Sequence, residues 1–90
     1  LRIDNSAGTL NLTVRDSSTN QAVIGRNGTT SGNDGIIVNG SGNSNITVLI
    51  DGVQFTGSRD NLIQILAEGT ATQNVTIRNN TFANLHPDVT

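Results

Sequence analysis

The side chains best able to do chemistry in this sequence are carboxylates, and they are spread along the chain. Calcium binding needs several carboxylate oxygens around one ion, and general acid–base catalysis needs a carboxylate within hydrogen-bonding reach of the substrate. Either site therefore requires the fold to bring distant acids together. Six acids are candidates: Asp4, Asp16, Asp34, Asp51, Asp60 and Glu68.

Few other residues could form a catalytic or cofactor site. Arg15 and Arg78 occupy equivalent positions after a repeated motif, and we expect them to lie on a solvated face, paired with Asp51 between them. His86, beside Pro87, has no second His or Cys at metal-ligand spacing, so we expect a tail residue. No glycine-rich stretch follows a strand and opens a helix, so the glycines indicate corners and not a phosphate loop. The sequence predicts no cofactor and no metal site.

Composition narrows the class of protein. The 90 residues include five Arg, no Lys and seven acids, a net charge of -2, which disfavours nucleic-acid binding. No apolar run reaches the eighteen or so residues of a membrane span. Asn, Thr, Gly and Ser make up 42 of the 90 residues, yet Ile, Leu, Val and Phe supply 25, enough for a folded core.

The elements that must position these residues are indicated by an internal repeat. The tetrapeptide NLTV (11–14) returns as NITV (45–48) and as NVTI (74–77), at spacings of 34 and 29 residues. A strand-like triplet precedes each copy, at 1–3, 36–38 and 63–65, and a third apolar patch follows, at 22–24, 53–55 and 81–83. Polar bends separate the segments, which therefore predict three short strands in each of three coils.

Apolar and polar residues alternate within each segment, so its side chains lie on two opposite faces. We expect each tetrapeptide to stack on its counterpart, with the aliphatic residues inward and the polar ones outward. The predicted core residues are Leu12, Val14, Ile46, Val48, Val75, Ile77, Phe55 and Phe82. The predicted outward ladder is Asn11, Thr13, Asn45, Thr47, Asn74 and Thr76.

A meander of hairpins also uses short strands and Gly/Asn turns, but it does not need one tetrapeptide about every 30 residues. The stretches NDGIIVNGSGNSNITV (33–48) and QNVTIRNNTFANL (73–85) resemble the right-handed parallel β-helix of the pectin-lyase-like superfamily, with Asn79, Asn80 and Phe82 matching its bend and core Phe. The resemblance implies an all-β fold, a right-handed parallel β-helix (β-solenoid) of about three coils. We expect one solenoid segment with coils at 1–34, 35–61 and 62–85 and a tail at 86–90.

The resemblance also implies what an enzyme of this kind would need. Members that cleave acidic polysaccharides hold calcium with aspartates on one outer face and use an Arg or Lys as the base. Here the outward positions of the first strand are Arg2, Ile37 and Gln64, and the acids fall at different bends and loops. We therefore expect no enzymatic activity.

The expected function is a structural or adhesive β-solenoid segment of an extracellular or cell-surface protein. Its partners would be adjacent coils or further copies stacked end to end into a longer solenoid or a fibre, and a cell-surface glycan. Two alternatives remain open: a non-catalytic fragment of a polysaccharide-active enzyme, and a glycan- or ice-binding module that uses the Asn-x-Thr face. Among Asn-x-Ser/Thr sites, Asn27 and Asn39 are the most accessible candidates for glycosylation.

Overall fold

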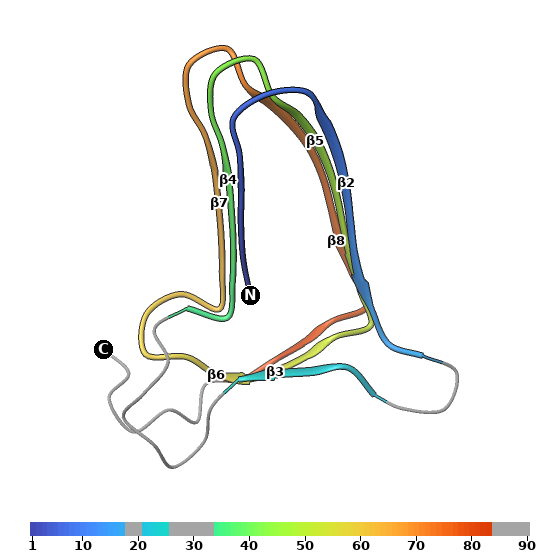
Figure 1. Cartoon of the computed structure of the whole chain (residues 1–90). Coiled ribbons are helices and arrows are strands. Elements are labelled where there is room, and N and C mark those ends of the chain that lie inside the picture. Colours follow the sequence, from blue (N-terminus) through green and yellow to red (C-terminus); the bar gives the residue numbers. More distant parts are fainter. Residues whose placement is uncertain (18–20, 26–33, 84–90) are drawn as a thin grey trace.

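The computed structural model describes residues 1–17, 21–25 and 34–83. These residues form nine strands and no helix, arranged as three parallel three-stranded sheets. Viewed along the stacking direction, the sheets are the three sides of a triangle (Figure 1). The sheets are, in order, β1 (Arg2–Asn5), β4 (Ile36–Gly40) and β7 (Ile63–Ala67); β2 (Thr9–Arg15), β5 (Asn45–Asp51) and β8 (Thr72–Arg78); and β3 (Val23–Gly25), β6 (Gln54–Gly57) and β9 (Thr81–Phe82).

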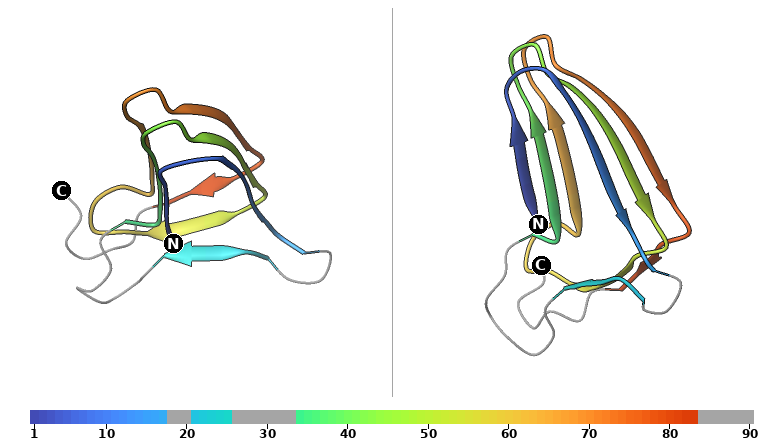
Figure 2. Two further views of the ribbon diagram at one scale, coloured as in Figure 1. Left: turned by 45° about the horizontal axis from the view of Figure 1, so that its top comes forward. Right: turned by 45° about the vertical axis from the view of Figure 1, so that its right-hand side comes forward.

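Each coil contributes one strand to each sheet, and the three coils lie on one another like three layers (Figure 2). The principal extents are 39 × 32 × 15 Å, and the shortest matches three layers at about 4.8 Å each. The predicted all-β class, with three short parallel strands in each of three coils, is therefore confirmed as a β-solenoid-like fold.

The register of the second sheet differs from the predicted one. Asn45 pairs with Thr9 and Thr72, whereas Thr47 pairs with Asn11 and Asn74. The prediction that each tetrapeptide rests on its counterpart is wrong, because the middle copy is displaced by two residues. A displacement of two keeps every side chain on its face, so the alternation still holds.

The middle and third coils share one constant period. Ile36 pairs with Ile63, Asn45 with Thr72 and Gln54 with Thr81, an offset of 27 residues in each sheet. The first and middle coils are offset by 35 residues at Arg2 and by 31 at Val23, because the first coil has longer connections after β2 and after β3. Core packing and strand hydrogen bonds therefore set the register, and the similarity of the tetrapeptides does not.

The bends are tight in the two regular coils. Between the first and second strands, Ser44 N donates to Ser41 O and Ala71 N to Glu68 O, both at 3.2 Å. Gly42 and Gly69 lie within these turns at φ of 58° and 66°, which glycine adopts without steric cost. These turns direct the chain from the first sheet into the second.

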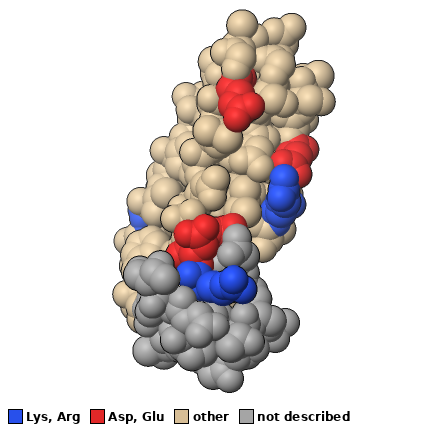
Figure 3. Space-filling model, turned by 90° about the vertical axis from the view of Figure 1, so that its left-hand side faces the viewer, with Lys and Arg blue, Asp and Glu red and all other residues tan. Residues whose placement is uncertain are grey.

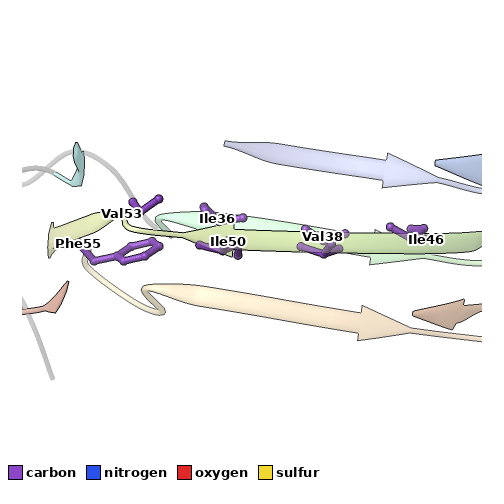
Figure 4. Close-up of a cluster of buried hydrophobic side chains, with 7 residues drawn as sticks. Ile36, Val38, Ile46, Ile50, Val53 and Phe55 are labelled. Carbon is purple, nitrogen blue, oxygen red and sulfur yellow. The ribbon is translucent and has the colours of Figure 1, made fainter. Parts of the chain in front are cut away.

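The core is concentrated in the middle coil. Its inward side chains lie in one layer between the ribbons of the coils on either side (Figure 4). Burial of each of these side chains contributes about 1.5–3 kcal/mol. The buried apolar residues are Ile36, Val38, Ile46, Val48, Ile50, Val53 and Phe55.

The core prediction is confirmed for the middle coil and only partly for the other two. Ile46, Val48 and Phe55 are buried, and Leu12 and Val14 pack against the core while half-buried. Burial was wrongly predicted for three third-coil residues, because a neighbouring coil covers only one side of them. These are Val75, Ile77 and Phe82, whose exposed fractions are 39%, 44% and 52%.

Candidate functional site

Among the described acids, Asp16 and Asp51 line one hollow at the second bend, and Asp4 and Glu68 line another beside the first sheet. Asp34 Oδ1 accepts from Asn61 N at 3.0 Å, Asp4 lies on the outer side of the first sheet and Asp51 lies at the second bend. On the face of the first sheet, acidic and basic side chains form small separate groups (Figure 3). Within 1–17, 21–25 and 34–83, no three His, Cys, Asp or Glu side chains gather where they could hold a metal ion.

Asp4 is bound by its neighbours on the first sheet. Arg2 Nε donates to Asp4 Oδ2 at 2.9 Å, and Asn39 Nδ2 donates to Asp4 Oδ1 at 2.9 Å. These two hydrogen bonds, that of Arg2 being the stronger cause, lower the pKa of Asp4. Arg2, Ile37 and Gln64 form one column of this sheet, as predicted.

Asn39 is less accessible than the sequence suggested. It is half-buried and bound to Asp4, whereas Asn11, Asn45 and Asn74 are exposed. The prediction that it is among the most accessible sites is therefore wrong, because its side chain is bound to Asp4 and lies between Asp4 and Leu66 in its column. Asn27 and His86 lie outside the described residues.

The second bend carries a column of alternating charge. Asp51 pairs with Arg15 of the first coil and with Arg78 of the third, which confirms the predicted position of the acid between the two arginines. Arg78 Nε lies 3.0 Å from Asp51 Oδ2, and Asn79 Nδ2 donates to Asp51 Oδ1 at 3.0 Å. Hydrogen bonds from Asn79 and then Arg78, together with the charge of Arg15, lower the pKa of Asp51.

Two asparagines build the third coil's side of this bend. Asn79 has a φ of 56°, a left-handed conformation that Asn tolerates better than most residues, and it follows Arg78 as Gly52 follows Asp51. Asn80 binds the middle coil twice: its Oδ1 accepts from Val53 N at 2.8 Å, and its Nδ2 donates to Ile50 O at 3.0 Å. The Asn80 side chain thus satisfies backbone groups where the strand ladder is interrupted.

The outer face of the second sheet is polar and exposed. Its columns are Thr9–Asn45–Thr72, Asn11–Thr47–Asn74 and Thr13–Leu49–Thr76. Thr72 Oγ1 donates to Asn45 Oδ1 at 3.2 Å, a hydroxyl–amide contact between neighbouring coils. The six predicted ladder residues lie on this face, but they form mixed columns of Thr and Asn, and Leu49 interrupts the third column.

The third coil carries an apolar surface, which we call the third-coil edge. Its residues are Ile63, Ile65, Val75, Ile77 and Phe82. Each pairs with a buried residue of the middle coil: Ile36, Val38, Val48, Ile50 and Phe55, respectively.

The geometry of this edge continues that of the core. The Phe55 and Phe82 rings stack with centroids 5.1 Å apart and an interplanar angle of 9°. In the described part of the chain, β7, β8 and β9 each pair on one side only, so strand hydrogen-bonding groups remain free beside the apolar residues. Such an edge can bind a further strand from each of three sheets.

The inward column of the second sheet also contains a polar residue that the sequence analysis missed. Gln73 pairs with Ile46, and its Nε2 donates to Leu66 O. The signal that could have found it is the 27-residue period, which places position 73 beside the buried position 46. The displaced tetrapeptide alignment concealed that relation.

Comparisons with known proteins give no relative from which to carry over a role. No family model, curated protein or solved structure matches the chain. Over the described residues, the fold offers no helix with the length and apolarity needed to cross a membrane.

Proposed function

We propose that the chain is a structural, non-catalytic segment of a β-solenoid that works by coil-on-coil stacking, as a stalk or adhesive element of an extracellular or cell-surface protein. The finer fold in this proposal is a right-handed parallel β-helix. The general right-handedness of connections between parallel strands supports that hand.

One observation carries the proposal: the third-coil edge combines exposed core-type side chains with free strand edges. Val75, Ile77 and Phe82 extend the buried columns of Val48, Ile50 and Phe55. Apolar surface of this kind is stable when another layer covers it, and short solenoids need neighbouring repeats or caps for that reason. A stacked coil would bury the apolar residues and pair the strand edges in one step.

The ion pairs made by two of the carboxylates support the non-catalytic part of the proposal. Asp4 and Asp51 are each held by an arginine and an asparagine, in different sheets and different coils. Carboxylates held in this way contribute to coil-to-coil contact. The acidic balance, the absence of Cys and Lys and the abundance of Asn, Thr, Gly and Ser support the extracellular setting.

A second candidate function, binding of a glycan through the outer face of the second sheet, is favoured by the exposed hydroxyl and amide columns. Thr9, Asn45 and Thr72 offer a continuous run of hydrogen-bonding groups across the three coils. Ice binding receives less support, since a regular lattice needs the same residue in each coil and these columns alternate between Thr and Asn.

Sedimentation of the chain at micromolar concentration tests the stacking proposal. We expect species larger than the monomer in about 0.5 M salt, where repulsion between like charges is screened. Val75→Lys, on the third-coil edge, should return the chain toward the monomer, whereas Thr76→Lys, on the outer face of the same strand, should leave association unchanged. A monodisperse monomer that melts cooperatively and is insensitive to Val75→Lys would contradict the proposal.

A further inference from the structure

On the second sheet, the first and third coils present the same residues to the outside, and the middle coil presents different ones. Strand β2 reads TLNLTVR and β8 reads TQNVTIR, whereas β5 between them reads NITVLID. On the second sheet, the first and third coils match at every outward position while the middle coil differs. The columns are Thr–Asn–Thr, Asn–Thr–Asn, Thr–Leu–Thr and Arg–Asp–Arg.

The alternation of residue types between coils has a physical reason, which is clearest in the column Arg15–Asp51–Arg78. Neighbouring coils are about 4.8 Å apart, so like charges in one column repel and opposite charges attract. Asp51 satisfies both arginines, by a direct ion pair to Arg78 and by its charge toward Arg15. Asn45 similarly accepts a hydrogen bond from the Thr72 hydroxyl of the next coil.

The third-coil edge therefore has a charge requirement as well as an apolar one. Arg78 lies at this edge with its side chain 57% exposed and with its partner Asp51 on one side. A second copy stacked head to tail would present its first coil, and would place its own Arg15 next to Arg78. A coil of the middle type would instead place a carboxylate there.

We propose that the third-coil edge binds a parallel coil of the middle-coil type, with a carboxylate next to Arg78, in preference to the first coil of an identical copy. This inference rests on the proposed function, that a coil covers the edge, and adds the chemistry of that coil. The outward columns of the second sheet would then continue to alternate along the stack, with a repeat of two coils on that sheet.

The test extends the full 90-residue chain by one coil. A second copy of residues 36–60, joined after Thr90, supplies a middle-type coil as the probe. The matched variant carries Asp51→Arg in the appended copy alone. The control carries Thr47→Arg in the appended copy, which places an arginine on the same strand next to Asn74 and away from Arg78. It raises the net charge by one, whereas Asp51→Arg raises it by two. Tm and hydrogen exchange of the β8 amides are measured in about 20 mM and about 0.5 M salt.

We expect the extension to raise Tm and to slow exchange of the β8 amides. Asp51→Arg in the appended copy should then lower Tm by about 3–6 °C in low salt, and by less than half of that in high salt. The Thr47→Arg control should change Tm by less than about 2 °C.

Two other results overturn the inference and are distinguishable. In the first, the extension protects β8 but the Asp51→Arg and Thr47→Arg variants have equal Tm at both salt concentrations. The edge then accepts a coil without selecting its charge, and the proposed function stands. If the extension neither raises Tm nor protects β8, the edge does not accept a coil, and the proposed function fails with the inference.

Discussion

At Asp51, one half-buried carboxylate interacts with side chains from the coils on both sides. It accepts hydrogen bonds from Asn79 and Arg78 of the third coil and lies in the same column as Arg15 of the first. The sequence predicted the position of this acid between two arginines, but not its contact with Asn79, because that contact depends on the left-handed backbone of a single bend residue.

The lowered pKa of Asp51 predicts how stability depends on pH. A carboxylate with a folded-state pKa below its unfolded value of about 3.9 stabilises the fold above that value, and the contribution is lost as the pH falls through the folded-state pKa. We expect Tm to fall as the pH is lowered below about 4. Asp51→Asn should lower Tm at pH 7 and flatten the acid decline, as followed by circular dichroism. Asp60→Asn, at an exposed loop position, is the control, and an equally steep acid decline in Asp51→Asn would count against this assignment.

At the scale of the strand, the sequence predicted the position and order of all nine elements. The reason is that β-branched triplets bounded by Gly, Ser and Asn have few alternatives. The pairing of β5 was less predictable, because NITV can align with NLTV directly or after a displacement of two with its inward side chains still buried. The displaced register pairs Asp51 with both Arg15 and Arg78, whereas the direct alignment would pair it with neither.

Paired cysteines test this register. In the observed pairing, Asn11 and Thr47 are direct neighbours, with Cα atoms about 4.8 Å apart, within the range that a disulfide spans. We expect the double variant Asn11→Cys and Thr47→Cys to form an internal disulfide on mild oxidation. Asn11→Cys with Asn45→Cys, two residues out of register and about 8 Å apart, should not. Faster cross-linking of the second pair, measured by mass spectrometry, would restore the direct alignment of the tetrapeptides.

At the scale of the whole molecule, the core is the middle coil with a partial layer on each side. Periodicity identifies which side chains face inward, but burial depends on how many coils lie above and below. For that reason Val48 and Val75, which occupy the same position in adjacent coils, are 1% and 39% exposed. Sequence patterning alone could not distinguish them.

The two valines should therefore differ in their contribution to stability. We expect Val48→Ala to lower the free energy of unfolding by about 2 kcal/mol and Val75→Ala by less than about 1 kcal/mol, since only the first leaves an enclosed cavity. Urea unfolding of dilute protein measures both values. Equal losses in the dilute monomer would mean that the third-coil edge is covered.

The second corner of the triangle, between the second and third sheets, accepts very different lengths of chain. Seven residues lie between Arg15 and Val23 in the first coil, but only two lie between Asp51 and Gln54 in the middle coil, and the third sheet still pairs Val23 with Gln54. Strand pairing is restored beyond the corner because the core and ladder contacts on both sides are unaffected by the segment between them. Insertions and deletions at this corner therefore leave the spacing between neighbouring coils unchanged. Homologous stacks can diverge there in length, and a foreign epitope placed there would be displayed at the side of the column without altering its rise.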